Sequence, residues 1–268
     1  MDFSLLENYC AQCCAIVKET GHFIRSELGR VQAGQIEEKS LNSLVSYVDR
    51  TAEEQLVARL EALLPGSVFL TEEGTVAATE GAYQWIIDPL DGTTNFLHGV
   101  PCFAVSVALR HNGALLIGVV YEVARQECFY AWKGGGAYLD GRPINASGAK
   151  KLSDSLIATG FPYRDYGRMR EYFLVFEHFM KKTRGLRRFG AAAVDLAYVA
   201  SGRFDVFFEY GLSPWDVAAG ILLVEEAGGF VSDFAGGGDP LFGSEMLAAA
   251  PGVYDAALEI TSPVFSKK

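Results

Sequence analysis

Five short apolar runs between Val68 and about Ala131 constrain the fold of this chain most. They read SVFL, QWII, FAVSVAL, ALLIGVV and ECFYAW, and turn signals such as His111-Asn112-Gly113 separate them. Runs of this length, rich in β-branched and aromatic residues, predict strands, and their close spacing predicts a mostly antiparallel sheet. The apolar faces of such a sheet must be covered by helices or by a second sheet.

Apolar residues at helical spacing precede this block. One pattern runs from Leu5 to Ile24, and a second runs from Leu56 to Leu64, where Pro65-Gly66 stops it. The N-terminal part therefore predicts two helices followed by the sheet.

The pattern changes after a Gly-rich stretch at residues 134–147 and the linker-like SGAKK. Short apolar strands (LIATG, DVFFEY, GGFVSD) then alternate with helical patterns near 168–182, 191–201 and 217–227. We therefore expect an α+β half over residues 1–147 and an α/β half over residues 148–268. Together they predict a layered sandwich of helices and sheets.

Composition places the chain among globular proteins. It has 268 residues, of which 50% are hydrophobic, and a mean hydropathy of +0.15. The net charge is −10, so the surface repels polyphosphates unless a local cation or metal reverses the field. Direct binding of nucleic acid is not expected.

The N-terminus predicts neither a signal peptide nor a membrane span, because it lacks a basic start and Glu7, Gln12 and Lys18 interrupt it. A cytoplasmic location follows as the expectation. The five cysteines are an odd number in a chain long enough to fold without disulfides, which favours reduced thiols. Three of them, Cys10, Cys13 and Cys14, lie in a helical pattern and predict packing rather than a metal site.

Two aspartates stand three positions apart in WIIDPLDGTTNF, residues 85–96. The apolar start predicts a strand that delivers Asp88 at its carboxyl end, where open sheets place their ligands, and Asp91 follows on the same rim. Two carboxylates this close repel each other unless a cation lies between them. Gly92-Thr93-Thr94 then allow close backbone approach and, at the start of a short helix, offer N–H groups to an anion such as phosphate. The alternative from this stretch alone is an ordinary Asp-Gly turn.

Further acidic residues lie near other predicted element ends. Glu72 and Glu73 follow the strand VFL, Asp216 stands at the head of a helix after DVFFEY, and Asp49 stands where another helix begins. Each has a structural alternative. The two glutamates could form a solvated loop, and Asp216 and Asp49 could cap their helices.

A set made only of carboxylates selects hard cations, Mg²⁺ or Mn²⁺, over zinc. The four His residues are scattered, and none has ligand spacing. Paired Mg²⁺ ions beside a phosphate cradle suggest hydrolysis of a phosphomonoester, in which the metals activate water and stabilise the leaving alkoxide.

On these residues the chain resembles the inositol monophosphatase family of Mg²⁺-dependent, lithium-sensitive sugar phosphatases. WIIDPLDGTTNF, PWDVAAG and the preceding Glu-Glu pair carry the resemblance, which spans about residues 5–260. It implies the family's αβαβα sandwich, two or three Mg²⁺ ions, a phosphorylated polyol or sugar as substrate, and a homodimer.

The resemblance also implies ligands for the metals. The first metal would be held by Glu72, Asp88 and the carbonyl group of Leu90. The second would be held by Asp88, Asp91 and Asp216.

Catalytic and substrate-binding roles follow from the same resemblance. Thr93 would orient the attacking water, and Glu72 with Asp49 would support a third metal, Asp49 through a water. The backbone amides of Gly92 and Thr93 would bind phosphate. The remaining substrate contacts would come from Ala192, in the segment FGAAAVDLAYVASG, and from Glu209 and Asp216.

Two positions depart from the family pattern. Thr71 stands where many relatives have Gly, which should alter only the loop backbone. Ala191 stands where many have Ser or Thr, which removes a hydroxyl group near the substrate.

Substrate identity therefore stays open. Alternatives within the enzyme class are fructose 1,6-bisphosphate, a dinucleotide 2′-phosphate and the 3′-phosphate of a nucleoside bisphosphate, although Thr94-Asn95-Phe96 argues against the last, whose phosphatases usually carry Lys or Arg there. Outside the enzyme class, the alternative is a regulatory binding protein, since some bacterial members of the family bind transcription machinery.

Overall fold

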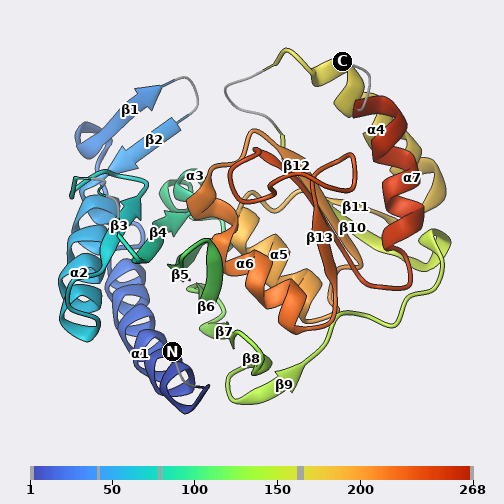
Figure 1. Cartoon of the computed structure of the whole chain (residues 1–268). Coiled ribbons are helices and arrows are strands. Elements are labelled where there is room, and N and C mark those ends of the chain that lie inside the picture. Colours follow the sequence, from blue (N-terminus) through green and yellow to red (C-terminus); the bar gives the residue numbers. More distant parts are fainter. Residues whose placement is uncertain (1–2, 41–42, 78, 80, 162–165, 266–268) are drawn as a thin grey trace.

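A computed structural model shows helices, sheet, helices, sheet and helices stacked in turn (Figure 1). The structure describes residues 3–40, 43–77, 79, 81–161 and 166–265. The predicted αβαβα sandwich is confirmed. From one outer layer to the other, the helices are α1 (Phe3–Ser26) and α2 (Tyr47–Leu63), then α5 (Ala192–Ala200) and α6 (Pro214–Glu226), then α4 (Met169–Lys182) and α7 (Tyr254–Phe265).

The first sheet has the strand order β3-β4-β5-β6-β7-β8-β9. All neighbouring pairs are antiparallel, as predicted, except β3 and β4, which run parallel. β4 is buried from Trp85 to Asp91, because helices cover both faces of the sheet there. The strands are β3 (Val68–Thr71), β4 (Tyr83–Asp91), β5 (Ala104–His111), β6 (Ala114–Glu122), β7 (Glu127–Trp132), β8 (Gly136–Leu139) and β9 (Arg142–Ile144).

The second sheet has the strand order β11-β10-β12-β14-β13. β10 runs parallel to β11 and β12, and the remaining pairs are antiparallel. The three strands expected in this half are present, and the sequence pattern missed β11, β14 and the last helix, α7. The strands are β10 (Leu156–Thr159), β11 (Gly185–Arg187), β12 (Val206–Tyr210), β13 (Phe230–Ser232) and β14 (Glu245–Ala249).

The helices between the two sheets are apolar on all sides. Every residue of α5 is buried, and so is α6 from Val217 to Val224. This pattern is expected for a helix covered by a sheet on each side. Gly118 of β6 allows the close approach of α6, because a Cβ atom there would lie 2.7 Å from the Ala219 carbonyl oxygen.

Three apolar cores fill the spaces between the layers. One lies between α1, α2 and the first sheet, one surrounds α5 and α6, and one lies between the second sheet and the outer helices α4 and α7. The middle core takes residues from both sides of residue 147, because α5 and α6 pack against β6. The two halves therefore share one interior, and their boundary at 147/148 stays a prediction.

Two small elements lie near one end of the sheets, and the sequence pattern missed the first of them. A hairpin of β1 (Ile36–Ser40) and β2 (Ser43–Ser46) precedes α2, and the predicted short helix after Gly92 is α3 (Thr93–Leu97) (Figure 1). Single 3-10 turns occur at Ala33–Gln35 and Leu152–Asp154.

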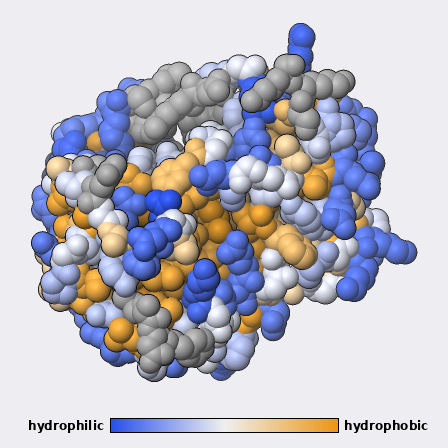
Figure 2. All heavy atoms as spheres, in the orientation of Figure 1, coloured by the Kyte–Doolittle hydropathy of each residue, from blue (hydrophilic) through white to orange (hydrophobic). Residues whose placement is uncertain are grey.

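Hydrophobic residues gather along the middle of the face that Figure 2 presents, and hydrophilic ones gather toward its margins. Within the described residues, no helix combines the length and the apolar character needed to cross a bilayer.

Candidate active site

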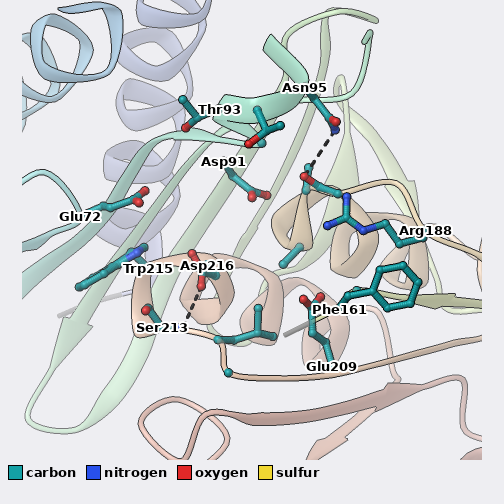
Figure 3. A pocket seen from close by; sticks show the side chains of 18 of the residues that line it. Glu72, Asp91, Thr93, Asn95, Phe161, Arg188, Glu209, Ser213, Trp215 and Asp216 are labelled. Carbon is teal, nitrogen blue, oxygen red and sulfur yellow. Dashed lines mark hydrogen bonds between the residues drawn. The ribbon is translucent and has the colours of Figure 1, made fainter. Parts of the chain in front are cut away.

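A cavity of about 160 Å³ lies where β3, β4 and β12 end and where α3, α5 and α6 begin (Figure 3). Seven of the ten residues that the sequence assigned to the site line it. They are Glu72, Asp91, Gly92, Thr93, Ala192, Glu209 and Asp216. The other three, Asp49, Asp88 and Leu90, are buried behind this wall, each about 1% exposed.

The parallel pairing of β3 and β4 brings the first acidic groups to one edge of the sheet. Thr71 at the end of β3 lies opposite Ile87 of β4, and the Glu72 N–H donates to the Ile87 carbonyl oxygen at 3.2 Å. Glu72 thus lies close enough to Asp88 for its charge to raise the pKa of Asp88. The irregular register after Asp88 then turns Asp91 toward the cavity. Thr71 keeps regular strand pairing, so a threonine instead of a glycine at this position leaves the end of β3 intact.

Asp49 and Asp216 both occupy the third position of a helix and form capping boxes. The Ser46 N–H donates to Asp49 at 2.8 Å, and the Ser213 N–H donates to Asp216 at 2.7 Å. Ser213, not Asp216, is therefore the N-cap of α6. Ser213 followed by Pro214 also explains why α6 begins three residues before the predicted 217. The capping role holds each carboxylate in one orientation beside the cavity.

The head of α5 fixes Asp91. The Ala193 N–H donates to Asp91 Oδ2 at 2.7 Å across 102 residues of sequence. Ala191 is the N-cap residue of α5 and makes no side-chain cap bond. A Ser or Thr at this position could cap the helix through a hydroxyl group on the pocket wall, and Ala191 has no such group.

Burial makes the carboxylates costly to ionise. It raises the pKa of Asp88 well above its usual range, and the charges of Glu72, Asp91 and Asp216 raise it further. Burial also raises the pKa of Asp91 to about 7, although the Ala193 N–H acts against this. Without protons or a cation, the four acidic groups would repel one another.

These residues fit a divalent cation. Carboxylate oxygens are the ligands that Mg²⁺ prefers, and a cation would relieve the repulsion around Asp88. An ammonium group already lies close by, since Lys39 Nζ of β1 is 3.0 Å from Glu72 Oε1. Among the described residues, no three Asp, Glu, His or Cys side chains converge on one point as a closed metal shell would. A metal would therefore need to draw Glu72, Asp91 and Asp216 inward.

The glutamate pair does not form a solvated loop. Lys39 Nζ lies 2.6 Å from Glu73 Oε1, and burial raises the pKa of Glu73 to about 7. Glu53, fully buried in α2, accepts the N–H groups of Glu73 and Thr75 at 2.8 Å each. Sequence reasoning missed both Lys39 and Glu53, because they lie in other elements of the chain.

Thr93 connects the cavity to the buried residues behind it. Its hydroxyl oxygen lies 3.0 Å from Asp49 Oδ1 and 2.9 Å from the Leu90 carbonyl oxygen. A hydroxyl group has one hydrogen, so it donates to one of them at a time. The structure thus joins three residues that the sequence assigned to the site from different segments.

Gly92 caps α3 in the left-handed region, with φ of 87°. A Cβ atom at this position would lie 3.0 Å from the Cys102 carbonyl oxygen and 3.3 Å from Ala191 Cβ. Both the conformation and the space require glycine, so the backbone between Asp91 and Thr93 can lie directly against the cavity.

The far wall of the cavity combines the predicted Glu209 with residues that were not predicted. Glu209 is 7% exposed, and burial raises its pKa well above the usual range. Phe161 and Arg188 lie near it (Figure 3). Asn95 Nδ2 donates at 2.8 Å to the carbonyl oxygens of both Cys102 and Phe189. No local pattern in the sequence identifies Arg188 or the tether through Asn95, because each depends on contacts between distant segments.

The chain is similar to known phosphatases along nearly its whole length. The sequence profile of the inositol monophosphatase family matches residues 5–262. An inositol-1-monophosphatase of Mesorhizobium japonicum is 42% identical over 93% of this chain and 94% of its own. A Nus factor SuhB of Pseudomonas aeruginosa is 45% identical over 92% of this chain and 93% of its own.

Solved structures agree in fold. The extragenic suppressor protein suhB of Bartonella henselae aligns with a TM-score of 0.89 and 38% identity, covering 98% of this chain and 99% of that one. An IMPase of Thermotoga maritima aligns with a TM-score of 0.85 and 32% identity, covering 95% and 96%.

Proposed function

Because the chain belongs to the inositol monophosphatase family and is a phosphoric monoester hydrolase, we propose that it uses Mg²⁺ to hydrolyse inositol monophosphate or a similar polyol or sugar monophosphate. The group of acidic residues around the buried Asp88 supports the proposal most, because their mutual repulsion calls for a cation. Mn²⁺ is the expected substitute.

The metal ligands in this proposal are Glu72, Asp88, Asp91, Asp216 and the carbonyl group of Leu90. Bound Mg²⁺ would polarise the phosphoryl group and make water a better nucleophile. Asp49 holds Thr93, whose hydroxyl group would orient that water. A third metal near Glu72 and Asp49 belongs to the same proposal.

The substrate would lie along the cavity wall from the Gly92 backbone toward Glu209. The N–H groups of Gly92 and Thr93 would donate to phosphate oxygens. Ala192 would contact the ring, and Asp216 and Glu209 would accept hydrogen bonds from hydroxyl groups. Fructose 1,6-bisphosphate and nucleotide phosphates remain alternatives, because the acidic group would bind metals in the same way for each of them.

A screen of phosphate release tests the proposal. The purified chain would be assayed with Mg²⁺ on a panel of polyol, sugar and nucleotide phosphates, with and without excess chelator. We expect release from polyol or sugar phosphates that stops in chelator. Full activity in chelator would overturn the metal assignment, and no release from any compound would overturn the function.

Lithium should inhibit the reaction, because it is expected to occupy a metal site after the chemical step and slow phosphate release. The inhibition should be uncompetitive with respect to substrate. Steady-state kinetics in LiCl, compared with equal KCl, measures this, and unchanged rates in LiCl would count against such a site.

A homodimer is part of the proposal. The outward side of α4 exposes Phe173 (50%), Leu174 (48%) and Met180 (57%), an apolar surface that a second copy would cover. Sedimentation of the purified chain at micromolar concentration tests this, and a monomer would contradict it. A cytoplasmic location is proposed as well, and fractionation of the source cells would test it.

A regulatory binding role remains an alternative beside hydrolysis, since a relative 45% identical carries the name Nus factor SuhB. Every carboxylate that the metal assignment needs is present, which favours catalysis. Asp91→Asn separates the two roles, because it should abolish hydrolysis and keep the fold. A regulatory phenotype that survives this substitution would support the second role.

A further inference from the structure

Glu53 is a buried carboxylate that belongs to neither the proposed metal ligands nor the proposed substrate contacts. It lies in α2, and none of its surface is exposed. Its Oε2 accepts the Glu73 N–H at 2.8 Å, and its Oε1 accepts the N–H and the hydroxyl group of Thr75 at 2.8 Å and 2.7 Å. All three donors belong to the loop that follows β3, so the hydrogen bonds of Glu53 join α2 to that loop.

Burial of this carboxylate is costly, and its hydrogen bonds only offset that cost. An apolar side chain of similar volume would pack against the same neighbours without it. The backbone N–H groups of a loop, by contrast, need an acceptor wherever they are turned away from water. The three hydrogen bonds therefore indicate that Glu53 serves the position of the loop more than the packing of α2.

The loop held by Glu53 begins with Glu72, which lines the cavity. The Glu72 N–H donates to the Ile87 carbonyl oxygen of β4 at 3.2 Å, and the next N–H, that of Glu73, donates to Glu53. These two N–H groups belong to the two peptide units on either side of the Glu72 Cα atom. Both planar units are thus held, and together they set the direction in which the Glu72 side chain leaves the backbone.

α2 also contacts a second segment of the site. Asp49 lies one helical turn before Glu53, on the same face of the helix, and its Oδ1 lies 3.0 Å from the Thr93 hydroxyl oxygen. The helix holds these two residues about 6 Å apart along its axis. Because one contacts Thr93 and the other contacts the loop after Glu72, α2 fixes the positions of these two parts of the site relative to each other.

A second contact to the glutamate pair works differently. Lys39 Nζ of β1 lies 3.0 Å from Glu72 Oε1 and 2.6 Å from Glu73 Oε1, so Lys39 binds the side chains. A divalent cation at the cavity would compete with this ammonium group for the Glu72 carboxylate. Glu53 binds the backbone of the loop instead, so its contacts leave the Glu72 oxygens available to a cation.

We propose that Glu53 is a positioning residue, which holds the loop after β3 so that Glu72 faces a divalent cation at the cavity. This inference rests on the proposed function, since that proposal assigns Glu72 to the first metal. Groups that orient a metal ligand from behind act mainly on the affinity for the metal. Glu53 therefore contributes to the binding of the cation and not to the chemical step.

Glu53→Gln tests the inference, because the amide keeps the shape of the side chain and loses one of its two acceptor oxygens. Titration calorimetry of the chain without substrate should show that the Kd for Mg²⁺ rises about 10- to 100-fold. Half-maximal phosphate release should shift to higher Mg²⁺ in the same way, with kcat at saturating Mg²⁺ within about threefold of the wild type. Thr75→Val, which removes only the hydroxyl donor, should change the Kd less than about threefold.

Glu54→Gln is the matched control. Glu54 is the exposed next residue of α2, so this variant removes the same charge from the acidic chain and should keep the wild-type Kd. Thermal unfolding without Mg²⁺ checks that each variant folds. Should Glu53→Gln fail to fold, hydrogen exchange of the metal-free wild-type chain still tests the inference. The Glu73 and Thr75 amides should exchange slowly, and exchange at the rate of an unstructured peptide would overturn it.

The outcomes of the titration are distinct. A folded Glu53→Gln protein that binds Mg²⁺ as tightly as the wild type would overturn the inference, whether or not the variant is less stable. A lower kcat with an unchanged Kd would do the same, because it would place Glu53 in the chemical step. Either result leaves the proposed function standing, and the phosphate screen tests that function separately. A wild-type chain that binds no Mg²⁺ would overturn the metal assignment and this inference with it.

Discussion

Two clusters of ionisable side chains, each wholly or partly buried, lie in different surroundings. Four thiols pack between α1 and β7, namely Cys10, Cys13, Cys14 and Cys128. Four carboxylates lie at the cavity, namely Glu72, Asp88, Asp91 and Asp216. Both clusters combine residues that are close in sequence with one that is distant, and both contain groups whose pKa is raised.

The thiols find hydrogen-bond partners within the core. Cys10 donates to the Ala131 carbonyl oxygen at 3.7 Å, and Cys14 hydrogen-bonds with Cys10 and Cys128. The hydrogen bond with Cys10, together with burial, raises the pKa of Cys14, so the thiol stays neutral and unreactive. A neutral thiol behaves as a small hydrophobic side chain, and these cysteines are reduced as the sequence predicts.

The carboxylates cannot do the same. At neutral pH an ordinary carboxylate is charged, and burial beside three others opposes that charge. The comparison teaches that burial of an ionisable cluster points to a bound ligand when counter-charge within the protein reaches only part of the cluster. Lys39 pairs with Glu72, whereas the charges of Glu72, Asp91 and Asp216 all raise the pKa of Asp88. Four experiments test this difference.

Asp91→Asn should have the largest effect. The amide keeps the shape but loses the charge that would hold the second metal, so kcat/KM in Mg²⁺ should fall by about 1,000-fold. Phosphate release from inositol monophosphate measures it, and the exposed Asp255→Asn serves as control. An Asp91→Asn protein as active as its parent would remove the distinction between the two clusters.

Glu209→Ala should have an intermediate effect, because Glu209 is a buried carboxylate assigned to the substrate instead of a metal. KM for inositol monophosphate should rise about 10- to 100-fold, as expected for a lost hydrogen bond to a charged group. The value for p-nitrophenyl phosphate, which has no hydroxyl group to offer Glu209, should stay nearly unchanged. Equal losses on both compounds would instead indicate damaged metal geometry.

Mg²⁺ should stabilise the carboxylate cluster measurably. At a concentration 100 times its Kd, a ligand adds about 2.7 kcal/mol to the free energy of unfolding, which for a chain of this size raises Tm by roughly 5 °C. Thermal unfolding in Mg²⁺ and in chelator gives the shift. It should shrink in Asp91→Asn, and an unchanged shift there would place the cation elsewhere.

Cys14→Ala should have the smallest effect. Removing one sulfur atom from the packed core should cost about 1 kcal/mol of stability, with kcat/KM and the Mg²⁺ shift as in the parent chain. Denaturant unfolding and the phosphate assay measure the two. Loss of activity in a folded Cys14→Ala protein would show that the thiol cluster is coupled to the site.

Local sequence was sufficient for part of the fold and part of the site. The helical spacing of α1 and α4 and the apolar runs of β4 to β7 were predicted close to their observed bounds, because burial of one face or of a whole strand imposes its own period. The hairpin of β1 and β2, the short β11 and the strand β14 were missed. Their few residues carry too little periodicity, and pairing with distant strands makes them strands.

The candidate site, like the fold, has one part that local sequence predicts and another part that it does not. The spacing of Asp88, Asp91, Gly92 and Thr93 is set by one strand end and one turn, so the sequence by itself determined that two carboxylates and a glycine-rich turn lie together. Parallel pairing of β3 with β4 decided that Glu72 joins them, since only then do both strands end at one edge.

Tertiary structure alone decided the rest of the wall. The hydrogen bond from the Ala193 N–H to Asp91 spans 102 residues, and the one from Asn95 to Phe189 spans 94. Neither contact produces a pattern in the local sequence. Both contacts exist because α5 and α6, apolar on all sides, are buried between two sheets. That burial places the first residues of both helices at the edge where β4 ends. Arg188, just before α5, and Asp216, in α6, therefore reach the cavity.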